Sequence, residues 1–466
     1  MAAMTQAEVS GIVAGLRERF DSGITKPRVW RMRQLKALRS MLVERSADFE
    51  RALASDLGKN ATEAQLVEIG FVIGEIDFTL KHLAAWLKPR AVSVPPAVMP
   101  ARASVVREPL GVVLVIAPWN YPVQLLLTPL IGALAGGNAV VLKPSELAPA
   151  TSAAMARWIP RYLDRSAVAV VEGAVDETTH LLAEKFDHIF YTGNGRVGRV
   201  VLEAAAKHLT PTTLELGGKS PVYIDDSVDL RSAAKRIVWG KYINAGQTCV
   251  APDYLLATAD VAARLEPLLA AAITELYGPD PHASADYGRI VNDTQFDRLT
   301  GLLEGGRLSV GGESDRVGRY IAPTVLGDVA RESEIMQQEI FGPILPIVTV
   351  AGVDDAIGFI RSGDKPLSLY VFSSSAGVRR RFTTETSSGA IGFGIPAAHL
   401  IVPGLPFGGV GASGTGAYHG ERSLDTFSHE KAVLSKPLSP DTMRLVYPPY
   451  TAKKDSFIRG ILRKLG

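Results

Sequence analysis

Two hydrophobic periodicities divide the chain. Before residue 88, apolar residues recur at three- and four-residue spacing in WRMRQLKALRSMLVERSADFERAL and QLVEIGFVIGEIDFTLKHLAAWL, which predicts amphipathic helices. Lys88-Pro89 and VSVPPAVMP end this region, and ASVVREP is typical of an extended segment. From Gly111, short apolar runs such as VVLVIAP, NAVVLKP and DHIFYTG alternate with helical stretches, and a second alternating region runs from about Lys219 to residue 400. This alternation predicts an α/β fold with doubly wound parallel sheets, which bind ligands at the carboxyl ends of their strands.

One apolar stretch admits a second interpretation. No charged residue occurs between Pro109 and Leu142, and residues 125–142 are mostly apolar, which by length alone suits a transmembrane helix. Pro129 and the Gly136-Gly137-Asn138 segment interrupt it, however. We therefore expect a core helix followed by a buried parallel strand.

Composition restricts the class of protein. The 466 residues, 47% of them hydrophobic, suffice for two or three domains. With 50 basic and 48 acidic residues, the formal net charge of +2 argues against a nucleic-acid partner. The single cysteine excludes an intrachain disulfide and a cysteine-rich metal site, so no metal is expected. The N-terminal sequence lacks the pattern of a signal peptide, and a free thiol fits a reducing, cytoplasmic location.

Cys249, in NAGQTCVAPDY, is the first candidate for chemistry. A lone cysteine is more often an inert buried residue than a nucleophile. Here, however, Gly246, Gln247 and Thr248 form an unusual loop after a helical stretch. In such a loop the thiol is exposed and nearby backbone N–H groups lower its pKa, which favours a nucleophile.

A glycine-rich segment, Gly193-Asn194-Gly195-Arg196-Val197-Gly198, follows the strand DHIFYT and opens a helix. That context is typical of a dinucleotide-binding fingerprint, whose helix start holds a pyrophosphate. The fingerprint also needs an acid about 20 residues later for the ribose, and Glu215 fits that spacing. The alternative is a glycine-rich turn without a ligand.

Polar residues follow two further strands. Lys143 and Glu146, in KPSE, end the strand NAVVL and face the expected ligand crevice, although a capped strand-to-helix turn is the commoner role for such a tetrapeptide. Asn120, in APWNYP, also follows a strand. Its amide is suited to donate to a developing oxyanion, although alone it is more often a turn residue.

The order of these segments is more specific than any one of them. APWNYP, KPSE, YTGNGRVG, LELGGKSP, GQTC, EIFGPILP and LPFGGVGASGTGAYHG resemble, in sequence and order, the signature segments of the aldehyde dehydrogenase superfamily. The resemblance covers about residues 10 to 435, and it is closest to the class 3 branch, which includes the fatty aldehyde dehydrogenases. It implies NAD(P)-dependent oxidation of aldehydes, of medium or long chain or aromatic, to carboxylic acids.

The resemblance also implies the catalytic roles. Cys249 would attack the aldehyde to form a thiohemiacetal, and hydride transfer to NAD or NADP would leave a thioester. Asn120 and the Cys249 backbone N–H would form the oxyanion hole. Glu215 would be the general base for hydrolysis, which conflicts with the ribose role suggested by the fingerprint.

The cofactor site follows from the same resemblance. Lys143 and Glu146 would meet the adenosine ribose, and Glu339 and Phe341, in EIFGP, would hold the nicotinamide ribonucleotide. Gly193, Asn194 and Gly198 would lie at the pyrophosphate. One departure is the Gly193-Asn194-Gly195 sequence where the family often has Gly-Ser-Thr, which leaves cofactor affinity and the choice between NAD and NADP open.

Two other functions remain as alternatives. A CoA-acylating dehydrogenase would pass the thioester to coenzyme A, but a water-activating Glu215 favours hydrolysis. A non-enzymatic protein on this fold need not keep Cys249, Glu215 and Asn120 together. The aldehyde is not identified, although Tyr121 and Trp239 are candidates for an apolar substrate pocket.

The resemblance implies three structural parts. Residues 1–88 and 110–213 would form the cofactor domain, residues 214–400 the catalytic domain, and residues 89–109 and 420–440 a small β arm for oligomerisation. Pairing of such arms across a two-fold axis would give a homodimer.

The tail, residues 441–466, predicts a basic amphipathic helix. In the fatty aldehyde branch a C-terminal helix lies near the substrate entrance. A docked or frayed terminus is one interpretation of this tail, and peripheral contact with an anionic membrane is another. Its apolar face would comprise Phe457, Ile458, Ile461, Leu462 and Leu465, and its cations are Lys453, Lys454, Arg459, Arg463 and Lys464.

Overall fold

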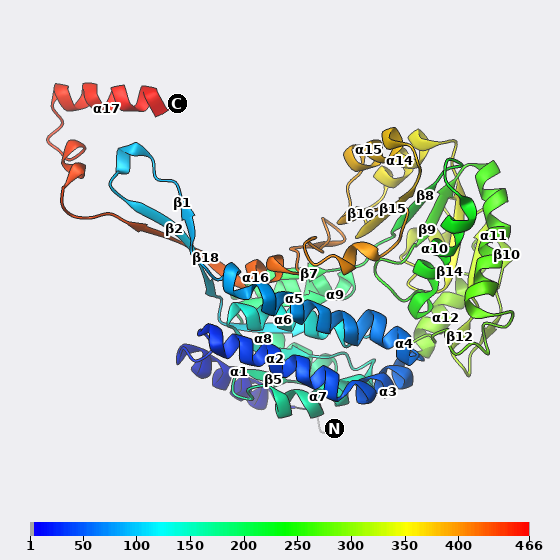
Figure 1. The fold of residues 1–466 in the computed structure, drawn as a ribbon. Coiled ribbons are helices and arrows are strands. Elements are labelled where there is room, and N and C mark those ends of the chain that lie inside the picture. Colours follow the sequence, from blue (N-terminus) through cyan, green and yellow to red (C-terminus); the bar gives the residue numbers. More distant parts are fainter. Residues whose placement is uncertain (1–3, 466) are drawn as a thin grey trace.

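A β arm and two α/β units follow one another along the long axis of the molecule (Figure 1). The computed structural model describes residues 4–465. Both units are built on largely parallel sheets, and the predicted α/β class with two doubly wound sheets is confirmed.

The first sheet has six strands in the order β17-β7-β6-β3-β4-β5, and only the β17–β7 pair is antiparallel. β7 reaches Glu215, beyond the boundary expected at residue 213. The strands are β3 (Val112–Ile116), β4 (Ala139–Lys143), β5 (Val168–Val170), β6 (His188–Thr192), β7 (Thr212–Glu215) and β17 (Gly414–Thr415).

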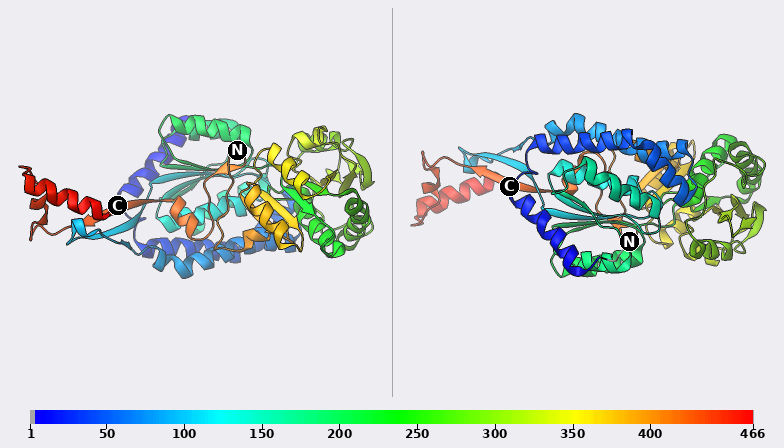
Figure 2. Two further views of the ribbon diagram at one scale, coloured as in Figure 1. Left: turned by 90° about the horizontal axis from the view of Figure 1, so that it is seen from above. Right: turned by 90° about the horizontal axis from the view of Figure 1, so that it is seen from below.

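Helices cover both faces of this sheet (Figure 2). Side chains alternate along β3 because successive strand residues point to opposite faces. Val112, Leu114 and Ile116 pack with α1 (Gln6–Asp21), α8 (Val175–Ala183) and α9 (Gly195–Ala206). Val113 and Val115 belong to the opposite core. That core is covered by α2 (Arg28–Glu44), α3 (Ser46–Leu57), α5 (Gly70–Trp86), α6 (Gln124–Gly136) and α7 (Pro149–Tyr162). Three short helical segments complete this unit: α4 (Ala61–Ala64), the π-helical turn η1 (Gln65–Ile69) and α16 (Glu421–Thr426).

The apolar stretch after Pro109 is part of the core. Residues 125–142 form most of α6 and β4, and every residue in them is buried, which confirms the expected core helix and buried strand. None of the helices in the described part of the chain combines the length and apolar character of a membrane span.

The second sheet has seven strands in the order β10-β13-β14-β9-β8-β15-β16, with only β10–β13 antiparallel. The strands are β8 (Pro221–Ile224), β9 (Tyr254–Ala257), β10 (Arg307–Val310), β13 (Thr324–Gly327), β14 (Ile344–Thr349), β15 (Ser368–Phe372) and β16 (Ala390–Phe393). A small hairpin joins β11 (Ser314–Asp315) and β12 (Tyr320–Ile321). The helical segments are α10 (Leu230–Tyr242), η3 (Ile243–Gly246), α11 (Ala259–Tyr277), α12 (Asp293–Gly301), α13 (Glu334–Gln337), α14 (Val353–Ser362), α15 (Ala376–Glu385) and η4 (Ala398–Ile401).

The arm is a three-stranded antiparallel sheet in the order β1-β2-β18. Its elements are β1 (Arg90–Val92), η2 (Pro96–Val98), β2 (Arg102–Pro109) and β18 (Ser428–Ser435). The tail continues through η5 (Thr442–Leu445) into α17 (Ala452–Leu465). α17 lies beside the arm, at the opposite end of the molecule from the second sheet (Figures 1 and 2).

Candidate active site

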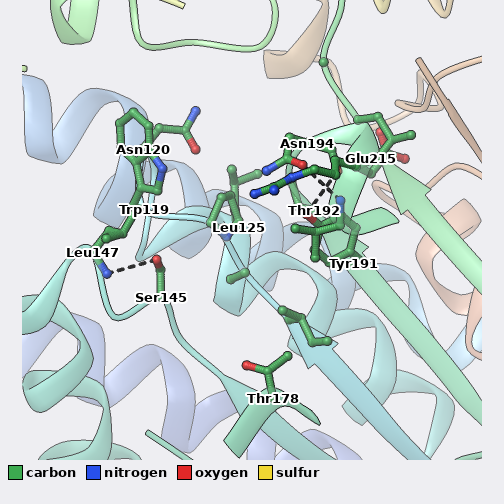
Figure 3. Close-up of a pocket in the computed structure, with 18 of the residues that line it drawn as sticks. Trp119, Asn120, Leu125, Ser145, Leu147, Thr178, Tyr191, Thr192, Asn194 and Glu215 are labelled. Carbon is green, nitrogen blue, oxygen red and sulfur yellow. Dashed lines mark hydrogen bonds between the residues drawn. The ribbon is translucent and has the colours of Figure 1, made fainter. Parts of the chain in front are cut away.

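A cavity of about 740 Å³ opens where the two α/β units meet. The carboxyl ends of β3, β4, β6 and β7 form one wall, and residues of the second unit form the other (Figure 3). Nine of the twelve site residues predicted from the sequence line this cavity. They are Asn120, Lys143, Glu146, Gly193, Asn194, Glu215, Cys249, Glu339 and Phe341.

The loop that carries Cys249 has an unusual backbone. After α10 ends, Asn244, Ala245 and Gly246 have φ values of 54°, 51° and 75°. Left-handed conformations cost free energy in residues other than glycine, so the surroundings must hold them. At Gly246 a Cβ would lie 2.3 Å from the carbonyl oxygen of Gly342, so only glycine fits.

Hydrogen bonds fix this loop from two sides. The Asn244 N–H donates to Glu63 Oε1 at 3.0 Å. Gln247 Nε2 donates to the carbonyl oxygens of Asn244 and Arg289, at 3.0 and 2.9 Å, and Gln247 Oε1 accepts from the Val291 N–H. The position of Cys249 is therefore set by buried polar contacts.

Asn120 joins this network from the other unit. Its Nδ2 donates to the carbonyl oxygen of Gln247 at 3.0 Å, and the side chain is buried at the cavity wall. The amide carries two hydrogens, and this bond uses one of them. The second has no acceptor among the described residues 4–465.

Glu215 ends β7 in a dry environment. The backbone carbonyl of Glu215 accepts a hydrogen bond from the Gly193 N–H at 3.0 Å, and Glu215 as a whole is 2% exposed. Neither carboxylate oxygen has a hydrogen-bond partner among residues 4–465. Burial raises the pKa of Glu215 well above its ordinary value, because desolvation disfavours the charged form.

The pKa of the Cys249 thiol differs from what the sequence predicts. The loop sequence predicts that backbone N–H groups lower this pKa. Burial raises it to about 12, and the negative charges of Glu339 and Glu215 add to that effect. The N–H groups of Cys249 and Val250 do lower the pKa, but they are outweighed.

The glycine segment forms the start of α9. Asn194 is its N-cap, and Asn194 Oδ1 accepts from the Val197 N–H at 3.0 Å, so this departure from the family pattern supplies a helix cap. At Gly193 a Cβ would lie 2.2 Å from the hydroxyl of Tyr191. Gly198 does not line the described cavity. Its lack of a Cβ lets α9 pack against Leu216 instead.

Lys143 and Glu146 both line the cavity but differ in exposure. Lys143 is buried, and its Nζ donates to the Pro144 carbonyl at 2.8 Å and contacts Glu146 Oε2 at 3.4 Å. Burial lowers the pKa of Lys143. The Glu146 side chain is 43% exposed.

Glu339 and Phe341 enter the cavity from the second unit. Glu339 packs against the backbone at Gly217, where a Cβ would lie 2.2 Å from a carboxylate oxygen. Burial raises the pKa of Glu339 to about 7. The ring of Phe341 contacts the edge of Trp119, with 5.5 Å between centroids.

Comparison with known proteins decides the family. The model of the aldehyde dehydrogenase family matches residues 1–433. Aldehyde dehydrogenase family 3 member A2 of Macaca fascicularis is 49% identical over 443 residues, which cover 95% of this chain and 91% of that protein. This chain belongs to the aldehyde dehydrogenase family. A second relative is the "aldehyde dehydrogenase, dimeric NADP-preferring" of Canis lupus familiaris. It is 47% identical over 448 residues, which cover 96% of this chain and 99% of that protein.

The fold of the family is present throughout the chain. The solved structure of the substrate-bound state of Staphylococcus aureus AldH is similar with a TM-score of 0.95 and 42% identity, covering 97% of this chain and 99% of that one. The chain is an NAD(P)-dependent aldehyde dehydrogenase, as the resemblance implied. The comparisons give no support to the CoA-acylating alternative.

Two predicted pocket residues of this aldehyde dehydrogenase lie outside the described cavity. Tyr121 is buried, and its hydroxyl is 2.7 Å from the Thr248 hydroxyl. Trp239 lies on α10 and is partly buried. Their contact with substrate stays a prediction.

Sequence reasoning missed several cavity residues. Trp119 stands in the APWNYP segment, and its position beside Asn120 was the available signal. Gln295 and Arg298 come from α12, where no local motif marks them. Arg298 donates to the Ile340 carbonyl at 2.6 Å, so it supports the segment that carries Glu339.

Glu339→Gln should increase the rate at which iodoacetamide alkylates Cys249. Removing the carboxylate charge lowers the pKa of the thiol, so more thiolate exists at a given pH. Because the pKa of Glu339 is about 7, the gain should be small below about pH 6 and larger above about pH 8. Rates of alkylation across pH measure it. Glu334→Gln, which changes an exposed glutamate five residues earlier in the chain, is the control. If the alkylation rates of the parent and of Glu339→Gln depended on pH in the same way, the electrostatic explanation would be contradicted.

Proposed function

We propose that this enzyme oxidises aldehydes through a covalent thioester on Cys249. The observation that carries this proposal is the meeting of Cys249, Asn120 and Glu215 in one cavity, from three separate segments. A nucleophile, an oxyanion donor and a base are the groups that acyl chemistry with hydrolysis requires.

The first step is attack of the Cys249 thiolate on the aldehyde carbon. Negative charge develops on the aldehyde oxygen, and the free Asn120 amide hydrogen and the Cys249 backbone N–H stabilise it. The product is a thiohemiacetal. A nicotinamide held by Glu339 and Phe341 would supply the acceptor for the hydride of the same carbon, which would leave a thioester on Cys249.

The second step is hydrolysis of the thioester. Glu215 accepts a proton from water, the resulting hydroxide attacks the thioester carbon, and the Cys249 thiolate leaves as the carboxylic acid forms. Burial raises the pKa of Glu215 from its ordinary value toward the working pH, where a general base is most effective.

The residues present fit a dinucleotide. The start of α9, with Gly193 and Asn194 at the cavity, offers backbone N–H groups to a pyrophosphate. Lys143 and Glu146 would hold the adenosine ribose, and Glu339 and Phe341 the nicotinamide ribonucleotide. The choice between NAD and NADP would then depend on Lys143 and Glu146, the two residues that would meet the ribose.

We also propose a homodimer. The outer edge of β18 is unpaired in the described chain, and Leu434 on that strand is 62% exposed. The outer edge of β16 is likewise unpaired within residues 4–465. Such edges are templates for pairing with another chain. The dog relative is named as dimeric, which supports a dimer here.

The tail contributes to substrate choice in this proposal. α17 lies beside the arm and far from the second unit, so it would reach a substrate entrance on the partner subunit of a dimer (Figure 1). Its exposed Phe457 offers apolar surface to a medium or long alkyl chain. Contact with an anionic membrane surface is the alternative role for its cations.

Cys249→Ala should abolish aldehyde oxidation, and Glu215→Gln should leave one turnover. Without the base, reduced cofactor forms once per site in stopped-flow measurements, and steady-state turnover then falls by roughly 10²–10⁴-fold. If Glu215 bound ribose instead, turnover at saturating cofactor would be normal and only the apparent affinity for NAD would fall.

Glu146→Gln should shift preference toward NADP. The substitution removes a negative charge that repels the 2′-phosphate, while Lys143 stays to attract it. The ratio of kcat/KM values for NADP and NAD measures the shift. Glu184→Gln is the control, because this glutamate follows α8, accepts hydrogen bonds from α1 and does not line the cavity. An unchanged ratio for Glu146→Gln would show that Glu146 does not meet the ribose.

Truncation after Thr451 should reduce kcat/KM for long-chain aldehydes more than for short ones. An apolar helix face near the entrance contacts only a long substrate. A series of aldehydes of increasing chain length measures the effect, with NAD and NADP in parallel. Equal losses across the series, or no loss, would rule out a role in substrate choice. Co-sedimentation with anionic liposomes tests the membrane role separately. Equal binding of the full-length and the truncated protein would refute that role.

A further inference from the structure

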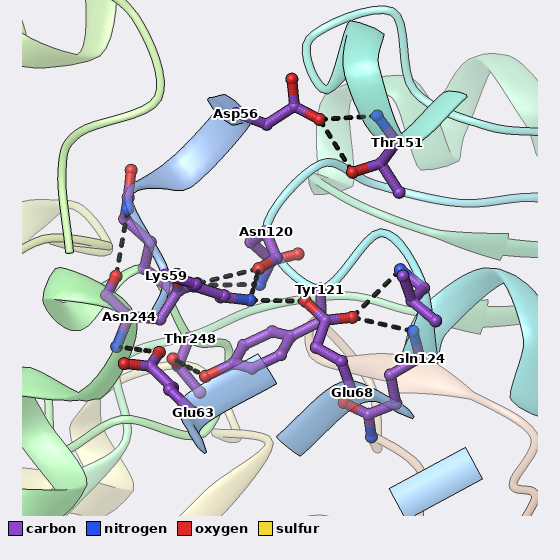
Figure 4. Close-up of polar contacts among 12 residues, drawn as sticks. Asp56, Lys59, Glu63, Glu68, Asn120, Tyr121, Gln124, Thr151, Asn244 and Thr248 are labelled. Atoms are coloured by element: carbon purple, nitrogen blue, oxygen red, sulfur yellow. Dashed lines mark hydrogen bonds and ion pairs between the residues drawn. The ribbon is translucent and has the colours of Figure 1, made fainter. Parts of the chain in front are cut away.

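A fully buried ion pair lies behind the catalytic loop, outside the described cavity (Figure 4). Lys59 Nζ and Glu68 Oε1 are 2.5 Å apart, and both side chains are 0% exposed. Removing two charges from water is costly, and an apolar pair of similar size often stabilises a fold as well or better. The pair therefore calls for an explanation other than stability.

Glu68 reaches the segment that follows Asn120 from a distorted helix. It lies in η1, the π-helical turn between α4 and α5, and such turns are frequent at functional sites. Its second oxygen, Oε2, accepts from the N–H groups of Val123 and Gln124 at 3.0 and 2.9 Å. Glu68 thus anchors the start of α6, directly after the Asn120 segment.

Lys59 holds the other end of the same segment. Its Nζ donates to the backbone carbonyl oxygen of Asn120 at 2.8 Å and lies 3.9 Å from the centroid of the Tyr121 ring. Asn244 Nδ2 donates to the same Asn120 carbonyl at 2.8 Å. The segment from Asn120 to Gln124 is therefore fixed at both ends by one ion pair.

We propose that Lys59 and Glu68 are positioning residues for the Asn120 amide. The pair holds the backbone of Asn120 so that one amide hydrogen meets the Gln247 carbonyl and the other is left for the substrate oxygen that becomes negative when Cys249 attacks. This inference rests on the proposed oxyanion role of Asn120. A donor misplaced by about 1 Å loses much of its effect on the transition state, which gives the pair a catalytic consequence.

The test compares kcat in a set of variants. Lys59→Met/Glu68→Gln removes both charges together, so no unpaired charge stays buried, and the glutamine oxygen still accepts from the start of α6. We expect kcat to fall about 10- to 100-fold while KM for the cofactor changes little. Asn120→Ala should lower kcat about 10²–10³-fold. Arg39→Met is the control, because it breaks the exposed Arg39–Asp77 pair between α2 and α5.

Two readouts separate positioning from general support of the fold. The triple variant with Asn120→Ala should be no slower than Asn120→Ala alone, since a residue that acts only through Asn120 adds nothing once the amide is gone. Alkylation of Cys249 by iodoacetamide forms no oxyanion, so its rate should be the same in the double variant and the parent. A further fall in the triple variant, or slowed alkylation, would overturn the proposal.

The outcomes also distinguish this proposal from the one beneath it. Normal kcat in Asn120→Ala would refute the oxyanion role itself. Impaired Asn120→Ala with normal kcat in the double variant would refute only the positioning role. Lys59→Met serves if the double variant does not fold, because burial raises the pKa of Glu68 and its carboxyl can stay neutral without a partner. A several-fold lower kcat with normal alkylation supports the proposal, and unchanged kcat contradicts it.

Discussion

The hydrogen bond from Asn120 Nδ2 to the Gln247 carbonyl, 3.0 Å long, is the contact on which the site depends. Asn120 follows a strand of the first unit, and Gln247 belongs to the loop of the second unit that carries Cys249. A bond between them fixes donor and nucleophile relative to each other, although their units have separate cores. The left-handed backbone conformations of Asn244 and Ala245 raise the free energy of this loop. The buried contacts around the loop hold it in that geometry.

Burial also sets the pKa values of the acidic groups in the site. Desolvation raises the pKa of Cys249, Glu215 and Glu339 together, because each would have to carry negative charge in the same dry cavity. One deprotonated group also raises the pKa values of its neighbours. The cavity therefore favours few negative charges at a time, and the thiolate needed for attack is created against the charge of the two carboxylates. The backbone N–H groups of Cys249 and Val250 act in the opposite direction and lower the pKa of the thiol.

The strands of the two sheets could be predicted from the sequence because a strand that is buried on both faces leaves a pattern in consecutive residues. Uninterrupted apolar runs such as VVLVI are typical of strands buried on both faces, and they became β3 and β4. The cavity residues at strand ends followed from the same rule. Arg298 and the π-helical position of Glu68 were missed, because only tertiary contacts bring them to the site. The direction of the Cys249 pKa was wrong, since loop composition does not reveal burial. The spacing that suggested a ribose role for Glu215 does not reveal where β7 ends, and the structure places Glu215 and Cys249 on the same cavity.

The residues that line the cavity differ in exposure. Asn120 and Glu215 are each 2% exposed, so charges and dipoles act strongly there and small displacements matter. The Glu146 side chain is 43% exposed, and water and salt weaken its interactions. A substitution at Glu146 therefore changes the electrostatics only modestly and leaves the buried residues undisturbed. Asn120 and the Cys249 loop have less freedom, because a buried hydrogen bond joins them across the two units.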